Sequence, residues 1–532
     1  MEKVIGPTVK KLKTSERMMS GLLRVVSVLG SPEKYYDKTE IVGGWVKNIR
    51  TGKNSTILFV ELSDGSCQKN LQLVLADTLP NFKDLLNQNV SACLRVKGKL
   101  VKSPAKGQPI EMLVDNPDEH LVEVLGENSD PKNYPLGGKF HSLEHLRSIL
   151  HLRPRTNIIG AMARLRNALS FATHTYFNEL GFLYVHTPLI TTSDCEGAGE
   201  MFQVSTIMKN NKEDIPSEEP AKTKVDYKQD FFNKPAYLTV SGQLAVENYS
   251  VGLNNVYTFG PTFRAENSNT SRHLAEFWMI EPEMCFAGLD ELLALTEGYV
   301  KFCIEYALNN IKDDIVFFNN VFKRKQKQKK KGKAKGGKGK GKGKGKGTEG
   351  KEKNFEDLIV YLESIISKPF AKMEYTEAIK ILEDAIANKK KKFVEKPYWG
   401  IDLGSEHERY LCEEVVDGPL FLYNYPATIK PFYMRLNDDK KTVQNMDLLL
   451  PFIGELVGGS VREERYEVLK GLMEDKGIEA EEYSYYLDLR KYGTSPHCGF
   501  GLGFERLVML VSGLENIRDA IPFPRTPGNC DC

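Results

Sequence analysis

Two short stretches of the chain limit most strongly what it can fold into. Residues 263–281 read FRAENSNTSRHLAEFWMIE and residues 501–506 read GLGFER. The first stretch gathers two arginines, a glutamate, a histidine and a phenylalanine, namely Arg264, Glu266, Arg272, His273 and Phe277. Guanidinium groups bind phosphates bidentately, a carboxylate accepts a hydrogen bond from the adenine amino group, and an aromatic ring stacks on the base. This combination predicts an ATP site.

The second stretch adds another guanidinium, Arg506, where a glycine-spaced strand is expected to turn into an apolar helix. Glycine at such a junction lets the backbone approach a nucleotide closely. The chain has no GxxxxGK[ST] sequence and no GxGxxG that follows a strand, which excludes P-loop and Rossmann nucleotide sites. A solvated charged face beside a core helix would explain either stretch alone. The two together favour a nucleotide site of another fold.

Residues 38–125 have the pattern of short strands separated by turns. Five apolar runs, EIVGGWV, TILFVEL, LQLVL, SACLRVKGKLV and EMLV, are interrupted by turn sequences such as SDGS at 63–66. Five strands in so short a span predict a small barrel of the oligonucleotide-binding (OB) type. Phe59 and Gln72 are expected on its binding face, although alternation alone leaves a core position open for Phe59.

The two nucleotide stretches resemble motifs 2 and 3 of class II aminoacyl-tRNA synthetases, and the chain as a whole resembles asparaginyl-tRNA synthetases of the bacterial type. The resemblance runs from about Leu23 to Pro527 and includes an ordered series of further segments: FVELSDGSCQKNLQ, HLRPRTN, TPLITTSDCEGAGEMFQVST, YLTVSGQL, YWGIDLGSEHERYL, KPFYMRLNDD, GELVGGSVREER and ENIRDAIPFPRTPG. It implies an α+β architecture, in which an N-terminal OB-fold barrel precedes a class II catalytic domain with an antiparallel sheet flanked by helices.

The resemblance also implies the reaction: ATP-dependent activation of L-asparagine to asparaginyl-adenylate, then transfer to the 3′ end of tRNA(Asn). The carboxylate of the amino acid is the nucleophile, so the protein contributes positioning and charge stabilisation. By resemblance, Arg264 contacts the α-phosphate and the attacking carboxylate. Arg272 or His273, together with Arg506, holds the β- and γ-phosphates.

Three further roles follow from the resemblance. Asp447 and Glu455 match the acidic pair that binds Mg²⁺, a cation that prefers carboxylate oxygen. In the barrel, Phe59 stacks on an anticodon base and Gln72 hydrogen-bonds one. The segment around Pro188 corresponds to motif 1, which lies at a two-fold interface, so a homodimer is expected.

An asparagine side chain requires an acceptor for its NH2 group and a donor for its C=O group. Glu281 is assigned the first role and Arg462 the second. Glu196, Ser241 and Gln243 are expected to hold the α-amino group.

The main alternative is an aspartyl-tRNA synthetase, discriminating or not, which shares the fold. Aspartyl enzymes carry Lys at the position of Val246, and the absence of that cation, with the added anion of Glu281, disfavours aspartate. Two positions depart from the asparaginyl pattern. Ala245 occupies a position where asparaginyl enzymes often have a larger polar residue, and Val461, where bacterial ones usually have Gln, matches the aspartyl enzymes. A paralogous asparagine synthetase would lack the barrel, and a non-catalytic RNA-binding relic would have lost motif residues that are present here.

These assignments divide the chain into an N-terminal extension 1–37, an anticodon-binding OB domain 38–125, a polar hinge 126–150 and a catalytic domain 151–532. A Lys/Gly-rich insert, residues 323–353, interrupts the catalytic domain. It holds fifteen Lys and one Arg against two Glu, so its charge is +14 and that of the remaining chain is −12, given the total of +2. With no large apolar residue, the insert is predicted to be disordered. We interpret it as an electrostatic tether for tRNA; a tolerated loop expansion and a localisation signal are the alternatives.

Composition excludes other classes of protein. No apolar run approaches eighteen residues, so no membrane span is expected. The basic N-terminus lacks the apolar core of a secretory signal, and the nine Cys are scattered without a CxxC pair. A cytoplasmic location is expected, with an organellar one left open.

Overall fold

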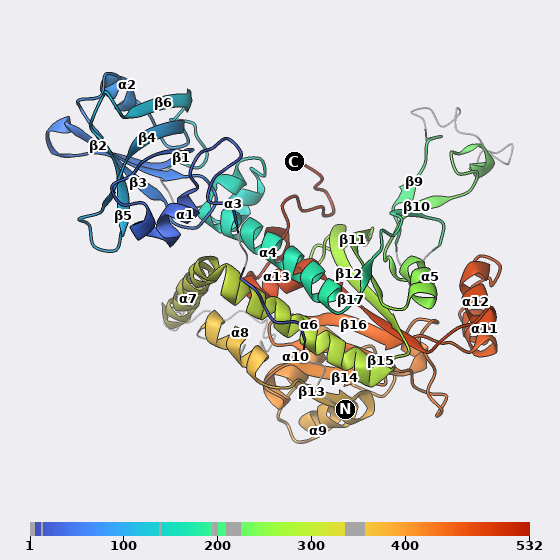
Figure 1. The fold of residues 1–532 in the computed structure, drawn as a ribbon. Coiled ribbons are helices and arrows are strands. Elements are labelled where there is room, and N and C mark those ends of the chain that lie inside the picture. The colour runs from blue at the N-terminus through green and yellow to red at the C-terminus, as the bar shows by residue number, and fades with distance from the viewer. Residues whose placement is uncertain are drawn as a thin grey trace. The chain divides into compact units, whose positions relative to one another are not determined.

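The computed structural model of the chain describes residues 6–11, 14–137, 141–193, 195, 200–208, 225–335 and 357–532. The chain divides into two compact units. The barrel unit comprises Lys10–Arg164 with Asn310–Phe318, and the catalytic unit comprises Met1–Val9, Leu165–Asn309 and Asn319–Cys532. Figure 1 shows the chain coloured from one end to the other.

The barrel unit contains the predicted OB-type barrel. Its strands follow the order β1-β2-β3-β5-β4-β6, and an additional pairing of β1 with β4 closes the sheet. The five expected strands are all present and a sixth, β6, extends the sheet: β1 Thr39–Thr51, β2 Ile57–Ser63, β3 Leu71–Ala76, β4 Cys93–Lys102, β5 Ile110–Val114 and β6 Leu121–Gly126. Two short helices, α2 (Phe82–Leu85) and α3 (Leu143–Arg147), belong to the same unit.

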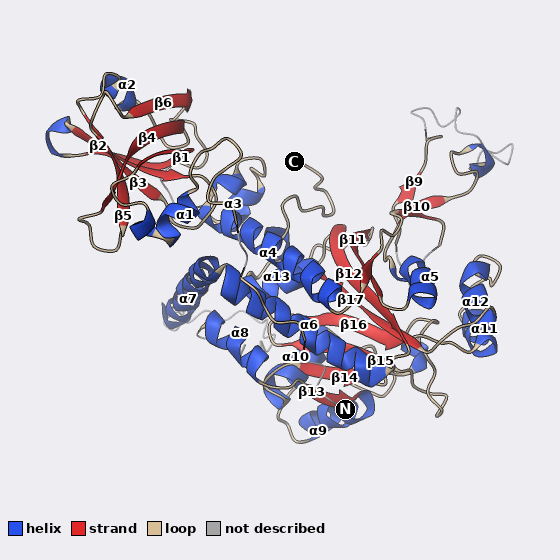
Figure 2. Cartoon of the chain, in the orientation of Figure 1, coloured by secondary structure: helices blue, strands red, loops and turns tan. Residues whose placement is uncertain are grey.

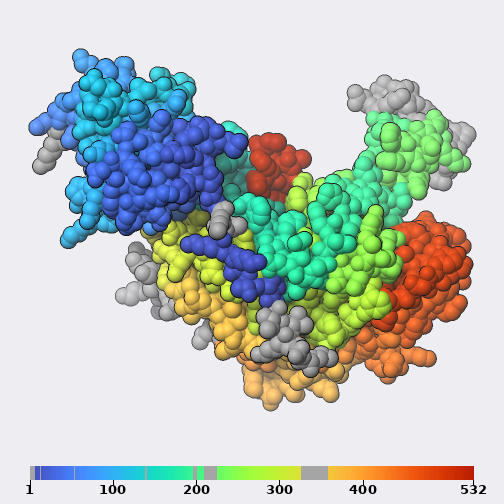
Figure 3. Space-filling view, viewed as in Figure 1, coloured from blue at the N-terminus to red at the C-terminus, as the bar shows by residue number. Residues whose placement is uncertain are grey.

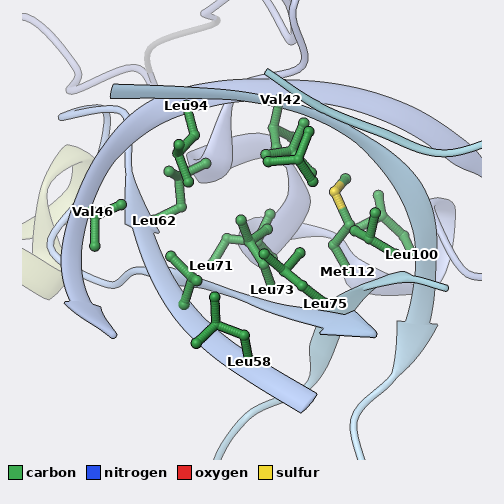
Figure 4. Packing of buried hydrophobic residues seen from close by; sticks show 14 of the residues in the cluster. Val42, Val46, Leu58, Leu62, Leu71, Leu73, Leu75, Leu94, Leu100 and Met112 are labelled. Atoms are coloured by element: carbon green, nitrogen blue, oxygen red, sulfur yellow. The ribbon is translucent and has the colours of Figure 1, made fainter. Parts of the chain in front are cut away.

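Alternate residues of the barrel strands fill its interior. On β2, Leu58, Val60 and Leu62 are at most 2% exposed, and the leucines of β3 join them (Figure 4). Because successive side chains of a strand point to opposite faces, Phe59 and Gln72 lie on the outer face. The core position left open for Phe59 is therefore excluded.

The folded barrel unit begins earlier than the predicted boundary at residue 38. Helix α1 (Val25–Gly30) contributes Val25 and Val28 to the barrel core, and Leu23 and Tyr35 join them. The N-terminal extension is thus, in its second half, part of the hydrophobic core that stabilises the barrel.

The catalytic unit is built on an eight-stranded sheet in the order β13-β14-β15-β16-β17-β12-β11-β7. All neighbouring pairs are antiparallel except β7–β11 and β13–β14. The strands are β7 Leu183–Tyr184, β11 Val256–Phe263, β12 Glu276–Cys285, β13 Ala371–Glu374, β14 Leu420–Tyr423, β15 Asn445–Leu450, β16 Gly454–Val461 and β17 His497–Gly503. The predicted α+β class with an antiparallel catalytic sheet is confirmed.

Helices surround this sheet (Figure 2). Helix α4 stacks Phe177 on Tyr257 of β11, with ring centres 4.7 Å apart, and α6 places Tyr299 against Phe500 of β17. Figure 1 shows α4 and α6 crossing the same region of the sheet. The helices are α4 Asn157–Glu179, α5 Gln243–Leu253, α6 Leu289–Asn310, α7 Lys312–Lys335, α8 Leu358–Ser367, α9 Tyr375–Ala387, α10 Ser405–Arg409, α11 Tyr466–Asp475, α12 Ser484–Lys491 and α13 Phe504–Ser512.

The segment around Pro188 forms two short strands that belong to different sheets. Strand β7 ends at Tyr184, and β8 (Ile190–Thr191) belongs to a separate three-stranded sheet with β10 (Ala236–Leu238) and β9 (Gln203–Val204). Pro188 lies in the gap between β7 and β8, where its missing N–H costs no ladder hydrogen bond.

The Lys/Gly-rich insert is partly helical. Helix α7 continues to Lys335, so residues 323–335 of the insert are helical. The helix is nucleated by the partly buried DDIVFFNNVF segment at its start, and Lys, Gln and Ala are good helix formers that let it continue. Residues 336–356 lie outside the described part of the chain. Among the described helices, none is long and apolar enough to cross a membrane.

Candidate active site

One face of the large sheet carries several of the predicted site residues. Phe277, Glu281 and Glu283 occupy alternate positions of β12, so their side chains share a face. Across β17, Glu283 pairs with Gly499, which pairs with Ser460 of β16. Because directly paired residues point the same way, Ser460 and the next strand's Asn445 lie on that same face. We call it the polar face.

Glycines keep the polar face open. A Cβ at Gly499 would lie 2.2 Å from Oε1 of Glu283, and one at Gly501 would lie 2.7 Å from the end of Met279. Longer side chains on β17 would therefore occupy the space above the strand. The intervening residues of β12 point to the other face, where Trp278 meets Phe259 at 5.3 Å between ring centres.

The motif 2 residues lie in the connection between β11 and β12 and in the first residues of β12. The Arg264 guanidinium carbon lies 5.3 Å from the centre of the Phe277 ring. His273 shares a hydrogen bond of 2.5 Å between Nδ1 and Oγ1 of Thr270, and its Nε2 lies 3.9 Å from Oε2 of Glu266. The structure thus groups Arg264 with the stacking ring and His273 with Glu266.

Arg272 and Arg506, from the two distant stretches, converge on one turn at the start of β16. Arg272 Nη2 donates to the carbonyl of Phe452 at 3.1 Å, and Arg506 Nη1 donates to the carbonyl of Glu455 at 2.5 Å. Burial, reinforced by the nearby Arg506 and Arg409, lowers the pKa of Arg272 below its usual value. Two guanidinium groups held this close form a site for an anion of high charge. Arg272 and His273 were the alternatives for the residue that lies beside Arg506, and the structure has Arg272 there.

The predicted acidic pair lies next to these arginines. Asp447 of β15 pairs across the ladder with Gly458 of β16. A Cβ at Gly458 would lie 3.2 Å from Glu455 Oε1 and 3.6 Å from Asp447 Oδ1, so both carboxylates converge over the glycine. Lys430 Nζ donates to Asp447 Oδ2 at 2.7 Å.

A third carboxylate, that of Glu408 on α10, lies near Arg272 at the start of β16. A Cβ at Gly454 would lie 3.2 Å from Glu408 Oε2 and 3.1 Å from Arg272 Nη1. Burial, reinforced by the negative charges of Glu455 and Asp447, raises the pKa of Glu408 to about 8. Within the described ranges no group of three or more His, Cys, Asp or Glu side chains has the geometry of a complete metal site.

The predicted asparagine residues are partly assembled around the start of α5. Ser241 Oγ donates to Glu281, and the backbone N–H of Gly242 donates to Glu281 Oε2 at 2.9 Å. The Gln243 side chain is 8% exposed, and its amide nitrogen has no hydrogen-bond partner among the described residues. Glu196 lies outside the described residues.

Arg462 is buried in a network of charges that sequence reasoning did not foresee. Its Nε donates to Glu283 Oε2 at 3.1 Å, its Nη2 also donates to Glu283, and Nη1 donates to Ser460 at 2.7 Å. Its Nε lies 3.2 Å from Oε1 of Glu247 on α5. The predicted amide donor is thus oriented by two buried carboxylates.

Glu247 connects this network to two more residues. Arg490 Nη2 of α12 lies 3.6 Å from it and His497 Nε2 of β17 lies 4.0 Å from it. Burial alone would raise the pKa of Glu247, but Arg490, His497 and Arg462 together lower it below its usual value. Burial lowers the pKa of His497. In the sequence these residues occur singly, and only the packing of helices α5 and α12 beside the ends of β16 and β17 brings them together.

The outer face of the barrel carries the predicted anticodon residues. The Arg50 guanidinium carbon lies 4.3 Å from the centre of the Phe59 ring. Gln72 Nε2 donates to Glu111 Oε2 at 3.5 Å, and Glu111 also accepts from Ser103 Oγ at 2.8 Å. An aromatic ring beside hydrogen-bonding groups on an open β-surface is suited to single-stranded nucleic acid.

Comparisons with known proteins agree with this geometry. A family model described as tRNA synthetases class II (D, K and N) matches residues 144–527, and one described as OB-fold nucleic acid binding domain matches residues 25–116. Asparagine–tRNA ligase of Protochlamydia amoebophila is 49% identical over 492 residues, which cover 92% of this chain and 94% of that protein. The same-named protein of Escherichia coli O157:H7 is 48% identical, over 93% and 96% of the two chains.

Solved structures give the same result. The crystal structure of asparaginyl-tRNA synthetase from Pyrococcus horikoshii complexed with asparaginyl-adenylate superposes with a TM-score of 0.76 at 29% identity, and covers 96% of this chain and 100% of that one. A putative aspartyl-tRNA synthetase from Leishmania major superposes with a TM-score of 0.68 at 20% identity, which shows the shared fold alone. The chain belongs to the class II tRNA synthetases of the D, K and N group, and within that group to the asparagine–tRNA ligases.

Proposed function

We propose that the chain ligates L-asparagine to tRNA(Asn) on the polar face, in two ATP-driven steps. Asparagine is first activated to asparaginyl-adenylate with release of pyrophosphate, and the asparaginyl group is then transferred to the 3′ end of the tRNA. The observation that supports this most is the convergence of Arg272 and Arg506 beside Asp447 and Glu455 on the same sheet that carries Glu281.

In the first step the carboxylate of asparagine attacks the α-phosphorus and the bond to pyrophosphate breaks. Arg264, one residue beyond β11, neutralises the attacking carboxylate and the α-phosphate in this proposal. Phe277 stacks on adenine, and Glu266 accepts from its amino group. Arg272 and Arg506 hold the departing β- and γ-phosphates, with His273 at their margin.

Asp447 and Glu455 would hold the Mg²⁺ ion, since Gly458 leaves the space between them open. When bound, the ion neutralises phosphate charge. Lys430 offsets the negative charge of Asp447. Burial alone would lower the pKa of Lys430, but Asp447 and Glu455 raise that pKa overall, so the ammonium stays charged.

Asparagine is selected by charge and by hydrogen bonding. Glu281 accepts from the substrate NH2 and is itself aligned by Ser241 and Gly242. Arg462 donates to the substrate C=O. Aspartate would place a carboxylate against Glu281. This loses the hydrogen bond that the asparagine NH2 would donate and introduces repulsion between two negative charges. Glu196, Ser241 and Gln243 hold the α-amino group.

In the second step the barrel holds the tRNA. The barrel recognises the anticodon, with Phe59 stacking on one base and Gln72 hydrogen-bonding another. The likeness to bacterial ligases favours a cytoplasmic location.

The chain acts as a homodimer through the motif 1 region. Strand β7 is the edge of the large sheet, and its apolar side chains are exposed: Leu183 by 51% and Tyr184 by 43%. Phe171 of α4 is 55% exposed and Leu189 is 41% exposed. An exposed edge strand with apolar neighbours favours a covering partner. A monomer mass at micromolar concentration, with full activity, would contradict this.

The Lys/Gly-rich insert, residues 323–353, serves as an electrostatic tether that raises encounter with tRNA. The rest of the chain carries −12 against a polyanionic substrate, while the insert carries +14. Removing 323–353 should raise KM for tRNA and flatten the dependence of binding on log salt, because each neutralised phosphate contributes about −0.7 to −0.9 to that slope. Equal salt slopes would show that the insert does not touch tRNA.

The function is tested by pyrophosphate exchange with asparagine, aspartate and lysine in turn. Exchange is expected with asparagine only, and charging is expected with tRNA(Asn). Exchange that aspartate stimulates in place of asparagine would overturn the substrate while leaving the fold unaffected.

A further inference from the structure

A helical turn that carries none of the assigned site residues lies beside the phosphate-binding arginines. Helix α10 continues directly into a π-helical turn, η6 (Tyr410–Val415), and the two pack against β15 and β16. Turns of this type are rare and occur mostly at functional sites. In Figure 3 the part of the chain around residue 400, coloured orange, lies at the lower side of the catalytic unit. The turn carries a buried carboxylate, that of Glu413, which is 6% exposed.

Glu413 connects this turn to the start of β16. Arg409 Nε donates to Glu413 Oε1 at 3.1 Å, and Arg409 Nη2 donates to Oε2 at 3.4 Å. The backbone N–H of Phe452 donates to Glu413 Oε1 at 3.1 Å. A carboxylate is stable in a buried place only where donors such as these replace water. Glu413 is thus held by Arg409 on its own helix and in turn holds Phe452.

The Phe452 backbone has a conformation that only its surroundings can maintain. Its φ is +70°, in the left-handed region where a residue other than glycine is strained and persists only when neighbouring contacts hold it. Tyr361 of α8 provides such contacts on the side away from Glu413. The Tyr361 ring meets the Phe452 ring edge to face at 5.9 Å between centres, and its hydroxyl donates to the Pro451 carbonyl at 2.9 Å.

The same residue orients Arg272 of motif 2. The N–H of Phe452 reaches Glu413, and the C=O of Phe452 accepts from Arg272 Nη2 at 3.1 Å. A neutral carbonyl orients the guanidinium group without neutralising its charge, whereas a carboxylate in that place would compete with a phosphate for it. Arg272 therefore keeps a fixed direction and a full positive charge.

We infer that Glu413 is a positioning residue for the activation step. It fixes Phe452, whose carbonyl directs Arg272 at the departing pyrophosphate. The inference rests on the proposed function, in which Arg272 and Arg506 hold the β- and γ-phosphates. Without Glu413, Arg272 would still be present but could turn away, so pyrophosphate binding and catalysis would suffer together. The asparagine residues around Glu281 would not be affected.

The first test compares two variants of equal size. Glu413→Met fills the same space but offers the Phe452 N–H no oxygen, whereas Glu413→Gln keeps one, and both remove the negative charge beside Arg409. In pyrophosphate exchange, Glu413→Met should lower kcat by about ten- to a hundredfold, because small misplacements of a binding group have effects of this size. It should raise KM for pyrophosphate and leave KM for asparagine unchanged. Glu413→Gln should recover most of the lost activity.

Glu414→Met is the matched control. Glu414 is the next residue of the same turn, but its carboxylate pairs with Lys391 and is 42% exposed. This variant should change neither kcat nor KM for pyrophosphate. The midpoint of urea unfolding, measured for all three variants, shows whether they are folded under the assay conditions. If Glu413→Met does not fold, Phe452→Gly takes its place, because glycine adopts φ +70° without strain and loosens the turn from the other side; it should show the same rise in KM for pyrophosphate.

The second test asks whether Glu413 acts through Arg272. In a chain that already carries Arg272→Ala, Glu413→Met should lower kcat by less than about twofold further, because coupled residues lose the same interaction only once. Losses that multiply, an equal rise in KM for asparagine, or a Glu413→Gln variant as impaired as Glu413→Met would each overturn the inference. Failure of the proposed function would look different, because the unchanged protein would then show no exchange with asparagine.

Discussion

The two faces of the large sheet use the same strands for opposite purposes. On the covered face, Phe259 meets Trp278 and Phe504, and Tyr299 and Phe500 pack from helix to strand. On the polar face, glycines of β16 and β17 leave space, and charged side chains line it. Neighbouring residues of one strand therefore differ in what they contribute: one packs into the core and the next faces the open, polar side of the sheet.

The largest expected contrast is between Glu281 and its neighbour Ile280 on β12. Glu281→Gln keeps the side-chain volume but replaces the acceptor for the substrate NH2 with a group that also donates. We expect kcat/KM for asparagine to fall by up to about 10⁴-fold, because buried polar partners become unpaired, while KM for ATP changes little.

Ile280→Val is the matched control on the covered face, where Ile280 is 0% exposed. It should lower the free energy of unfolding by about 0.5–1.5 kcal/mol and leave kcat/KM for asparagine within twofold. If kcat/KM for asparagine also stays within twofold in Glu281→Gln, Glu281 does not bind the side-chain amide of asparagine.

The next contrast concerns stability on the covered face. Phe500 is 1% exposed, and Phe500→Ala should lower the free energy of unfolding by about 3–5 kcal/mol through lost burial and the cavity left behind. Denaturant unfolding measures this, and exchange activity assayed well below the transition should persist. Loss of activity with unchanged stability would place Phe500 in the site.

On the polar face, Glu455→Ala should lower kcat for pyrophosphate exchange and shift its Mg²⁺ titration to higher concentration, with KM for asparagine comparatively spared. Mg²⁺-induced stabilisation against heat gives a reading that does not depend on activity. Glu464→Ala is a suitable control, because Glu464 pairs with Arg435 at 3.0 Å and lies outside the proposed metal site. An unchanged Mg²⁺ titration in the Glu455 variant would remove this residue from the metal site.

The smallest expected effect is on pH dependence, through His497. The His497 ring faces Glu247 of α5, Arg490 of α12 and Arg462, which follows β16, and its Nδ1 hydrogen-bonds the Ser495 carbonyl at 2.8 Å. Burial lowers its pKa in the folded state, so the unfolded chain binds the proton more tightly. The stability that this group contributes is complete above its unfolded pKa of about 6.5 and is lost as pH falls toward the folded value.

His497→Gln should therefore flatten the stability profile below about pH 6.5 and leave it unchanged at pH 8. The midpoint of urea unfolding, measured at both pH values, tests this. An equal decrease of the urea midpoint at pH 8 would indicate that His497 contributes to stability through packing and not through titration.

Local pattern predicted much of the fold because the relevant interactions are close in sequence. Alternation and turn residues were enough for the five expected barrel strands, and the glycine-spaced GLGFER stretch correctly predicted a strand, β17, followed by helix α13. Local pattern failed where packing at a distance decides. Leu23 and Val25 precede the predicted barrel yet fill its core, and α7 continues into the Lys-rich segment because its start is anchored by apolar contacts.

The sequence by itself determined which chemistry to expect, since the motif 2 and motif 3 residues predict an ATP site and the acidic pair predicts a cation site. Only the tertiary structure decided which of those residues meet. It placed Arg272 with Arg506, turned Phe59 outward, and buried Arg462 between Glu283 and Glu247. The physical reason is that strand pairing joins residues hundreds of positions apart, and the energy of a buried charge depends on those partners and not on its neighbours along the chain.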